Sequence, residues 1–147
     1  MREILFRGKD DNNNWCYGYA IIGKRFKWAS ILPIDTIDDA PPMFDECEVE
    51  LDTVGQYTGL TDKNGTKIFE GDIVEMHYFF ENHDPNTLGM FEDENYIKGY
   101  LKCDELGLVL IDKNQVKYRV SDYVQEPCEE LEVIGNIYDN PELLEGL

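Results

Sequence analysis

The 147-residue sequence has few of the side chains that enzymes use for catalysis. It has two histidines and only two serines, Ser30 and Ser121, and neither serine lies in a G-x-S-x-G motif. It has no G-x-x-x-x-G-K-[ST] loop for binding phosphate. Among its 31 acids, no pair stands out as a catalytic pair. These absences predict a protein that is not an enzyme, with no catalytic residue, metal or cofactor assigned.

Long apolar runs and paired cysteine motifs are also missing. No run approaches the ~20 apolar residues of a membrane helix, and the start of the sequence has no signal-peptide pattern. Cysteine occurs at four spread positions without C-x-x-C: Cys16, Cys47, Cys103 and Cys128. We therefore expect a cytoplasmic protein with reduced thiols. Cys47 and Cys103 are expected to be buried, because they occupy apolar positions of strand-like patterns.

Basic residues are scarce, and their distribution is uneven. There are 13 Lys and Arg against 31 Asp and Glu, a net charge of -18. Residues 1–37 carry six basic and four acidic side chains, so the other 110 residues carry -20. Because nucleic-acid binding needs clustered Lys and Arg, direct binding of DNA or RNA is disfavoured. Two explanations of the charge stay open, namely solubility, or a face that mimics nucleic acid or engages a basic partner protein.

The pattern that is present is one of short strands separated by turns, with no convincing helical periodicity. It predicts a mainly-β fold with an N-terminal aromatic hairpin and, from about residue 66 onward, a small SH3-like β-barrel. We expect two parts, residues 1–53 and 54–147, which could also form one continuous domain. Residues 81–95 read as a long acidic loop. Asn140 and Pro141 predict a short C-terminal helical turn with Asn140 as its cap.

The N-terminal hairpin, residues 15–22 and 25–32, is rich in aromatic side chains. One strand would carry three of them on one face and the other strand two, which are Trp15, Tyr17, Tyr19, Phe26 and Trp28. The simpler interpretation is a small aromatic core. The alternative is an exposed stacking surface for bases or sugars, helped by Lys24, Arg25 and Lys27.

The most informative stretch is residues 54–75, which contains four glycines and the turn Asp62-Lys63-Asn64-Gly65. The turn resembles the start of a calcium loop but has neither the third Asx residue before its glycine nor a Glu at the twelfth position. An Asn-Gly hairpin turn explains it better. If this stretch binds anything, we expect the binding residues to be Asp62, Lys63, Asn64, Glu70 and Asp72.

One group of residues has the composition of a metal site. It consists of His77, Glu81, His83 and Asp84. The spacing matches no zinc motif, and the expectation is two surface histidines beside acids.

Three segments together resemble the YopX family, small proteins of bacteriophages and prophages. The first is VGQYTGLTDKNGTKIFEGDIV at residues 54–74. The second is the start, residues 4–9 followed by Trp15-x-Tyr17-Gly18, which is similar to the family's F-R-x-x-D and W-x-Y-G pattern. The third is the end, residues 132–144, similar to E-V-I-G-N-I-Y-x-N-P-E-L-L. The resemblance implies a mainly-β fold and a phage origin, but no activity and no site residues.

Three functional hypotheses follow. The leading one is a non-enzymatic phage accessory protein that binds a protein of the phage or of its host bacterium, in the host cytoplasm. The first alternative is an acidic mimic of nucleic acid that inhibits a host DNA-binding enzyme. The second is a ligand or nucleic-acid binder that uses the aromatic hairpin. A homo-oligomer is compatible with each of them.

Overall fold

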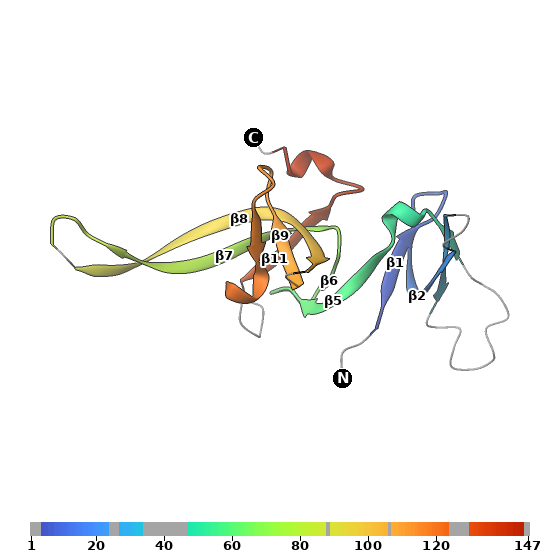
Figure 1. The fold of residues 1–147 in the computed structure, drawn as a ribbon, viewed down its shortest axis with the longest axis horizontal. Coiled ribbons are helices and arrows are strands. Elements are labelled where there is room, and N and C mark those ends of the chain that lie inside the picture. The colour runs from blue at the N-terminus through green and yellow to red at the C-terminus, as the bar shows by residue number, and fades with distance from the viewer. Residues whose placement is uncertain are drawn as a thin grey trace. The chain divides into compact units, whose positions relative to one another are not determined.

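The computed structural model describes most of the chain, namely residues 4–23, 27–33, 47–87, 89–105, 107–123 and 130–145. The chain divides into two compact units, Met1–Gly59 and Leu60–Leu147 (Figure 1). Strands make up 61% of the structure and helical turns 8%, which confirms the mainly-β prediction. Within the described stretches, no helix has the length and apolar character needed to span a membrane.

The first unit is an antiparallel sheet. Its elements are β1 (Phe6–Lys9), β2 (Trp15–Gly23), β3 (Trp28–Pro33), β4 (Cys47–Val49), a 3₁₀ turn (Leu51–Thr53) and β5 (Gly55–Thr61). The full strand order of this sheet is β4-β3-β2-β1-β5-β6, where β6 (Lys67–Phe69) and the end of β5 past Gly59 belong to the second unit. The predicted aromatic hairpin is β2 and β3, with Gly23 opposite Trp28 and Ala20 opposite Ile31.

The core of the first unit lies on one face of this sheet, around the buried side chains of Ala29, Ile31 and Val49. Cys16 and Cys47 border this core and are joined as a disulfide, so the expectation of reduced thiols is wrong for this pair. Spacing along the chain does not show which strands become neighbours, and here β3 pairs with both β2 and β4, so that the side chains of Cys16 and Cys47 meet on the core side of the sheet. The burial expected for Cys103 is also wrong: it is exposed, because it lies beside the turn that ends its strand.

Besides β6, the second unit has five strands: β7 (Asp72–His83), β8 (Met90–Asp104), β9 (Gly107–Ile111), β10 (Lys117–Arg119) and β11 (Leu131–Asn136). Its five-stranded antiparallel sheet has the order β10-β9-β8-β7-β11. Its core gathers side chains that alternate along the strands, as the two-residue period of a strand requires. They include Val74 and Met76 of β7, which lie opposite Gly99 and Ile97 of β8.

The strands β7 and β8 are much longer than their neighbours. β11 pairs with β7 only up to Met76, and β9 pairs with β8 only from Tyr100 onward. Beyond these points β7 and β8 continue as a two-stranded ribbon, visible at the left of Figure 1. We call residues 77–83 and 90–98 the arm. The prediction of a loop over residues 81–95 is therefore wrong, because strand pairing that starts in the core continues through these acidic residues to His83 opposite Met90.

Three hairpin turns share one design, Asp-x-Asn-x-x. In each, the first Asp Oδ1 accepts the backbone amides two and four residues later at 2.9–3.0 Å. The fourth residue has a positive φ, with values of 63° at Asn13, 81° at Gly65 and 65° at Gln115. The three turns therefore begin at Asp10, Asp62 and Asp112, and the middle one is the turn of the family-like stretch.

The SH3-like barrel is not confirmed, since the described strands form two antiparallel sheets and no closed barrel. The sheet of the second unit keeps β10 and β11 as separate edges, and its longest strands extend outward as the arm. Pro141–Leu143 form a single 3₁₀ turn. Asn140 makes no side-chain cap there, and its Oδ1 accepts the Asn136 amide at 3.3 Å instead.

Candidate binding site

The predicted turn residues are mostly occupied by structural contacts. Asp62 is buried, and its Oδ2 accepts the Val133 amide at 2.9 Å while Oδ1 holds the turn. Lys63 forms an exposed ion pair with Glu132 at 3.0 Å. The hydrogen bond and charge of Glu132 raise the pKa of Lys63. Asn64 is exposed at the tip of the turn.

The other two residues predicted in this stretch follow β6. Glu70 is partly exposed in the turn before β7. Asp72 is buried, and its Oδ2 accepts the Phe69 amide at 2.8 Å. Asp62 and Asp72 are thus buried carboxylates that accept backbone hydrogen bonds, which is a common way for the fold to satisfy main-chain donors. The binding role predicted for these residues stays a prediction.

The described aromatic side chains of β2 and β3 lie on the sheet face opposite the core of the first unit. Tyr17, Tyr19 and Trp28 are 40–47% exposed. Trp15 is half-buried, with the Arg7 guanidinium 4.4 Å from the centre of its ring. The aromatic core predicted for the hairpin is therefore not formed by these residues, whereas Phe26 lies outside the described residues. The core uses smaller side chains from the other face.

One face of the arm combines aromatic rings with acids. The His77 ring stacks on Tyr96 with centroids 4.4 Å apart, and its Nε2 lies 2.8 Å from a carboxylate oxygen of Glu94. Phe79 contacts the His77 ring on the same face and is 54% exposed. Because side chains alternate along each strand, this aromatic face of the arm is built from odd-numbered residues of β7 and even-numbered residues of β8.

The histidines do not form the metal site that their composition resembles. In the described part of the chain, no three of His77, Glu81, His83 and Asp84 converge as ligands. At the end of the arm, Asp84 instead accepts the amide of Asn86, and this bond lowers the pKa of its carboxyl group.

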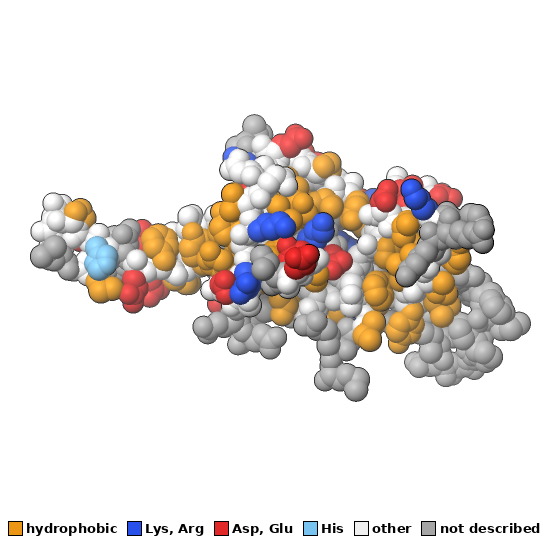
Figure 2. Space-filling model, in the orientation of Figure 1, with side chains coloured by type: hydrophobic (Ala, Val, Ile, Leu, Met, Phe, Trp, Pro, Cys, Tyr) orange, Lys and Arg blue, Asp and Glu red, His pale blue; other side chains and the backbone are white. Residues whose placement is uncertain are grey.

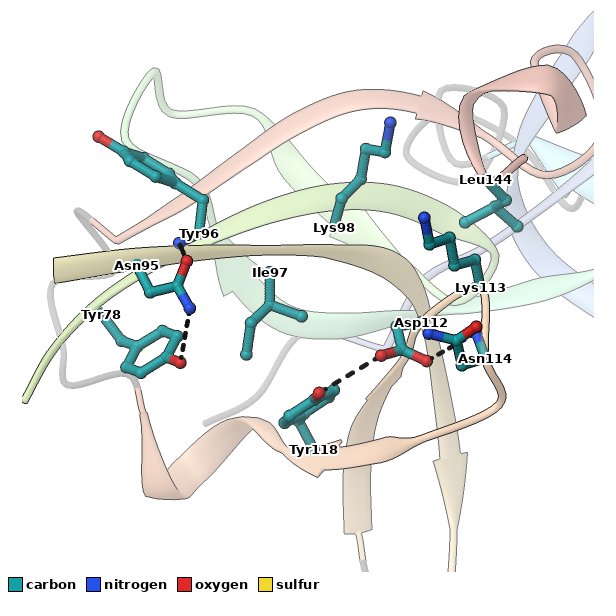
Figure 3. A pocket seen from close by; sticks show the side chains of 10 residues that line it. All are labelled: Tyr78, Asn95, Tyr96, Ile97, Lys98, Asp112, Lys113, Asn114, Tyr118 and Leu144. Atoms are coloured by element: carbon teal, nitrogen blue, oxygen red, sulfur yellow. Dashed lines mark hydrogen bonds between the residues drawn. The ribbon is translucent and has the colours of Figure 1, made fainter. Parts of the chain in front are cut away.

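A pocket of about 370 Å³ lies where the arm leaves the sheet. The pocket runs along the edge of β8 that pairs with β9, beyond the point at Tyr100 where β9 ends. At this unpaired edge, side chains from both faces of β8 line the pocket (Figure 3). Its residues come from β7, β8, the β9–β10 turn, β10 and the C-terminal segment: Tyr78, Asn95, Tyr96, Ile97, Lys98, Asp112, Lys113, Asn114, Tyr118 and Leu144.

Hydrogen bonds fix the floor of this pocket. The Tyr118 hydroxyl donates to Asp112 Oδ2 at 3.3 Å, and Asn95 Nδ2 donates to the Tyr78 hydroxyl at 3.3 Å. Burial and the neighbouring Asp112 carboxylate both raise the pKa of Tyr118. Lys98 and Lys113 supply two cationic groups to the pocket, and Asp112 supplies one carboxylate, whose oxygens already accept hydrogen bonds from backbone amides and the Tyr118 hydroxyl. The pocket can accept a polar or anionic group.

Comparison with known families gives one match, to the family described as YopX protein, over residues 5–145. The chain belongs to the YopX family. The resemblance seen in three sequence segments is thereby confirmed over nearly the whole length. No curated protein matches this YopX family member.

The arm and the pocket were not found by sequence reasoning. The available signal was the composition of residues 77–83 and 90–98, in which aromatic residues and acids are interspersed without glycine or proline. Such a pair of segments around Asp84-Pro85-Asn86 is compatible with a long hairpin.

Proposed function

We propose that this member of the YopX family is a non-enzymatic binding module and that its arm binds another protein. The observation that carries the proposal is the exposure of large apolar side chains on the arm, with Phe79 and Tyr96 each 54% and Met90 58% exposed. A two-stranded ribbon is only marginally stable in water by itself. Exposed apolar patches of this kind usually mark interaction surfaces. A partner that covers these side chains would stabilise the arm.

The charge of the arm indicates the chemistry of the partner. Residues 77–97 contain no Lys or Arg. The face shown in Figure 2 displays acidic and apolar side chains together along the arm. The arm therefore favours a partner surface that is apolar at its centre and basic around it. We place this partner among the proteins of a phage or its host. The acids of the arm are Glu81, Glu92, Asp93 and Glu94, and Asp84 lies in the turn that joins its two strands.

The test compares two exposed apolar residues of the second unit. Phe79→Ser removes a ring from the arm, and Val116→Ser makes an equivalent surface change in the β9–β10 connection, where Val116 is 46% exposed. Immobilised wild type and Val116→Ser should retain the same basic proteins from host lysate. Phe79→Ser should lose them, because truncating a central aromatic contact costs about 2 kcal/mol or more. Retention that is equal for all three proteins would contradict the proposal.

A second candidate function rests on the first unit. Tyr17, Tyr19 and Trp28 expose aromatic surface on one sheet face, as a stacking surface for bases or sugars requires. Titration of the protein with single-stranded oligonucleotides or oligosaccharides would then quench tryptophan fluorescence. The double variant Tyr17→Ala/Tyr19→Ala should abolish the quenching, whereas no quenching in the wild type would rule this function out.

The nucleic-acid mimic stays a further alternative. It needs carboxylates in a continuous row along the surface. On the aromatic face of the arm, Glu81 lies opposite Glu92 and Glu94 follows two residues further along β8, but the next cross-strand pair is His77 with Tyr96, so the acids form a short cluster and not a long row. This arrangement favours protein binding over mimicry. A mimic would release a host nuclease from DNA, and an assay of nuclease activity with added protein tests that directly.

A further inference from the structure

We propose that the partner binds by strand addition: an extended segment of the partner pairs with the outer edge of β8 in the arm. This inference rests on the proposed function and adds the binding mode. It also specifies the segment, which should be basic where it meets the arm and acidic where it reaches the pocket.

The outer edge of β8 is open in the arm. β9 occupies this edge only opposite Tyr100–Asp104, where Tyr100 faces Ile111. Over residues 90–98, no strand of the described chain lies on that side, since the only strands next to β8 are β9 and β7. An open strand edge presents backbone donors and acceptors that another strand can use.

Two amides show which residues point outward along this edge. The Glu94 amide donates to Asp93 Oδ1 at 2.9 Å, and the Tyr96 amide donates to Asn95 Oδ1 at 2.8 Å. Because these two amides donate to the side chain of the preceding residue, they point away from β7 and are not donors in the hydrogen-bond ladder between β7 and β8. Because outward amides recur every second residue, Lys98 belongs to the same outward set. Asp93 and Asn95 thus cover the edge until a partner strand replaces them.

The pocket marks where an added strand would end. Such a strand would be collinear with β9, and the place opposite Tyr100 is already taken by Ile111. The end of the strand would therefore lie at the pocket, beside Lys98 and Lys113. A carboxylate there would meet two ammonium groups, whereas side chains further along would face Glu94 and Glu92.

A second copy of this chain fits this edge poorly. Antiparallel pairing with Glu92 of one copy opposite Lys98 of the other would bring residue 90 opposite Tyr100, where Ile111 already lies. Shifting the register by two residues clears Ile111 but places Glu94 against Glu94. Like charges directly opposite are destabilising in a ladder. A segment of a different protein avoids both conflicts.

The probe is a synthetic peptide, acetyl-Glu-Val-Val-Thr-Lys-Thr-Lys-amide. In antiparallel pairing its glutamate faces Lys98 and its lysines face Glu94 and Glu92. The control peptide exchanges the glutamate with the final lysine, which places like charges together at both ends. With the first peptide, the amides of Glu94 and Tyr96 should exchange hydrogen roughly tenfold more slowly. The control peptide should give no protection.

Two sets of variants separate edge pairing from other contacts. Glu94→Pro removes an outward amide without removing a bond to β7, and Glu94→Ala is its matched control because it keeps the amide. Glu94→Pro should bind the probe roughly tenfold more weakly than Glu94→Ala. Asp93→Glu/Asn95→Gln keeps the charge but moves the covering oxygens away from the amides, so it should bind several-fold more tightly. Unchanged chemical shifts of the core confirm that each variant is folded.

The outcomes also distinguish this inference from the proposed function. If neither the wild type nor Asp93→Glu/Asn95→Gln binds the probe, or if Glu94→Pro binds it as well as Glu94→Ala does, strand addition is wrong. Partner capture that is lost in Phe79→Ser but kept in Glu94→Pro would overturn strand addition and support binding through the aromatic face. Capture that is unaffected by Phe79→Ser would contradict the proposed function itself.

Discussion

Asp62 and Val133 are joined by a 2.9 Å hydrogen bond from the Val133 amide to the Asp62 carboxylate, across 71 residues of sequence. The same carboxylate holds its own turn through its other oxygen. Two other turns of the protein have the same design, but the second oxygen of Asp112 accepts the Tyr118 hydroxyl, which lies only six residues away. The middle turn therefore links the family-like stretch to β11, which contributes the family-like C-terminal segment.

Asp62→Asn should lower the free energy of unfolding by about 2 kcal/mol, because the new amide group would point a donor at the Val133 donor in a buried site. Asp112→Asn is the matched control. There the amide can donate to the Tyr118 hydroxyl, so we expect a change below about 0.5 kcal/mol. Urea unfolding followed by circular dichroism measures both, and equal effects would contradict the role assigned to the Val133 contact.

The fourth position of these turns gives a second pair of substitutions. Gly65 has φ 81°, and a Cβ added there would meet no atom within 4 Å, so Gly65→Ala should cost about 1 kcal/mol from backbone conformation alone. Gln115 has φ 65° without being glycine, so Gln115→Gly should stabilise the protein by about 0.5 kcal/mol. Opposite signs in thermal unfolding are the expected result. A loss of stability in Gln115→Gly would show that its side chain contributes more than its backbone conformation costs.

The raised pKa of Tyr118 predicts a dependence of stability on alkaline pH. The folded state favours the neutral phenol, so its contribution is complete below the ordinary pKa of about 10. Above that pH the unfolded chain loses the proton first, and the contribution disappears as pH rises through the folded pKa. Tyr118→Phe should therefore flatten the fall of stability above pH ~10. Asp112→Asn should lower the pKa of Tyr118, seen by ultraviolet titration, while burial keeps it raised.

The disulfide between Cys16 and Cys47 closes a chain segment with a sequence separation of 31. By the loop-entropy relation its loss should cost about 4 kcal/mol. The double variant Cys16→Ser/Cys47→Ser should melt at a lower temperature than the wild type without reductant and should not respond to added reductant. Cys103→Ser should keep the full response. A wild type whose melting is unchanged by reductant would contradict the disulfide.

The sequence was sufficient for those features that depend on local pattern. Alternation and turn residues predicted the strands, the β2–β3 hairpin and the turn at Asp62–Gly65, because these depend on neighbours within a few residues. Family membership could also be predicted, since it rests on contiguous motifs.

Features set by distant pairing could not be predicted. The arm continues through acids that favour loops locally, because its register is established in the core by Val74 and Met76. The contact of Asp62 with Val133 and the approach of Cys16 to Cys47 depend on which strands become neighbours. The pocket exists only because β9 ends at Ile111 while β8 continues, and relative strand lengths are not encoded in either segment alone.

β8 is a single uninterrupted strand that belongs to the core at one end and to the arm at the other. Sliding the arm by one residue would turn Ile97 and Leu101 out of the interior, so its register cannot change while the second unit stays folded. The register of the arm is thus fixed by the fold of the second unit. Any ligand that binds the arm should raise the melting temperature of the second unit, and the increase should grow with the logarithm of the ligand concentration.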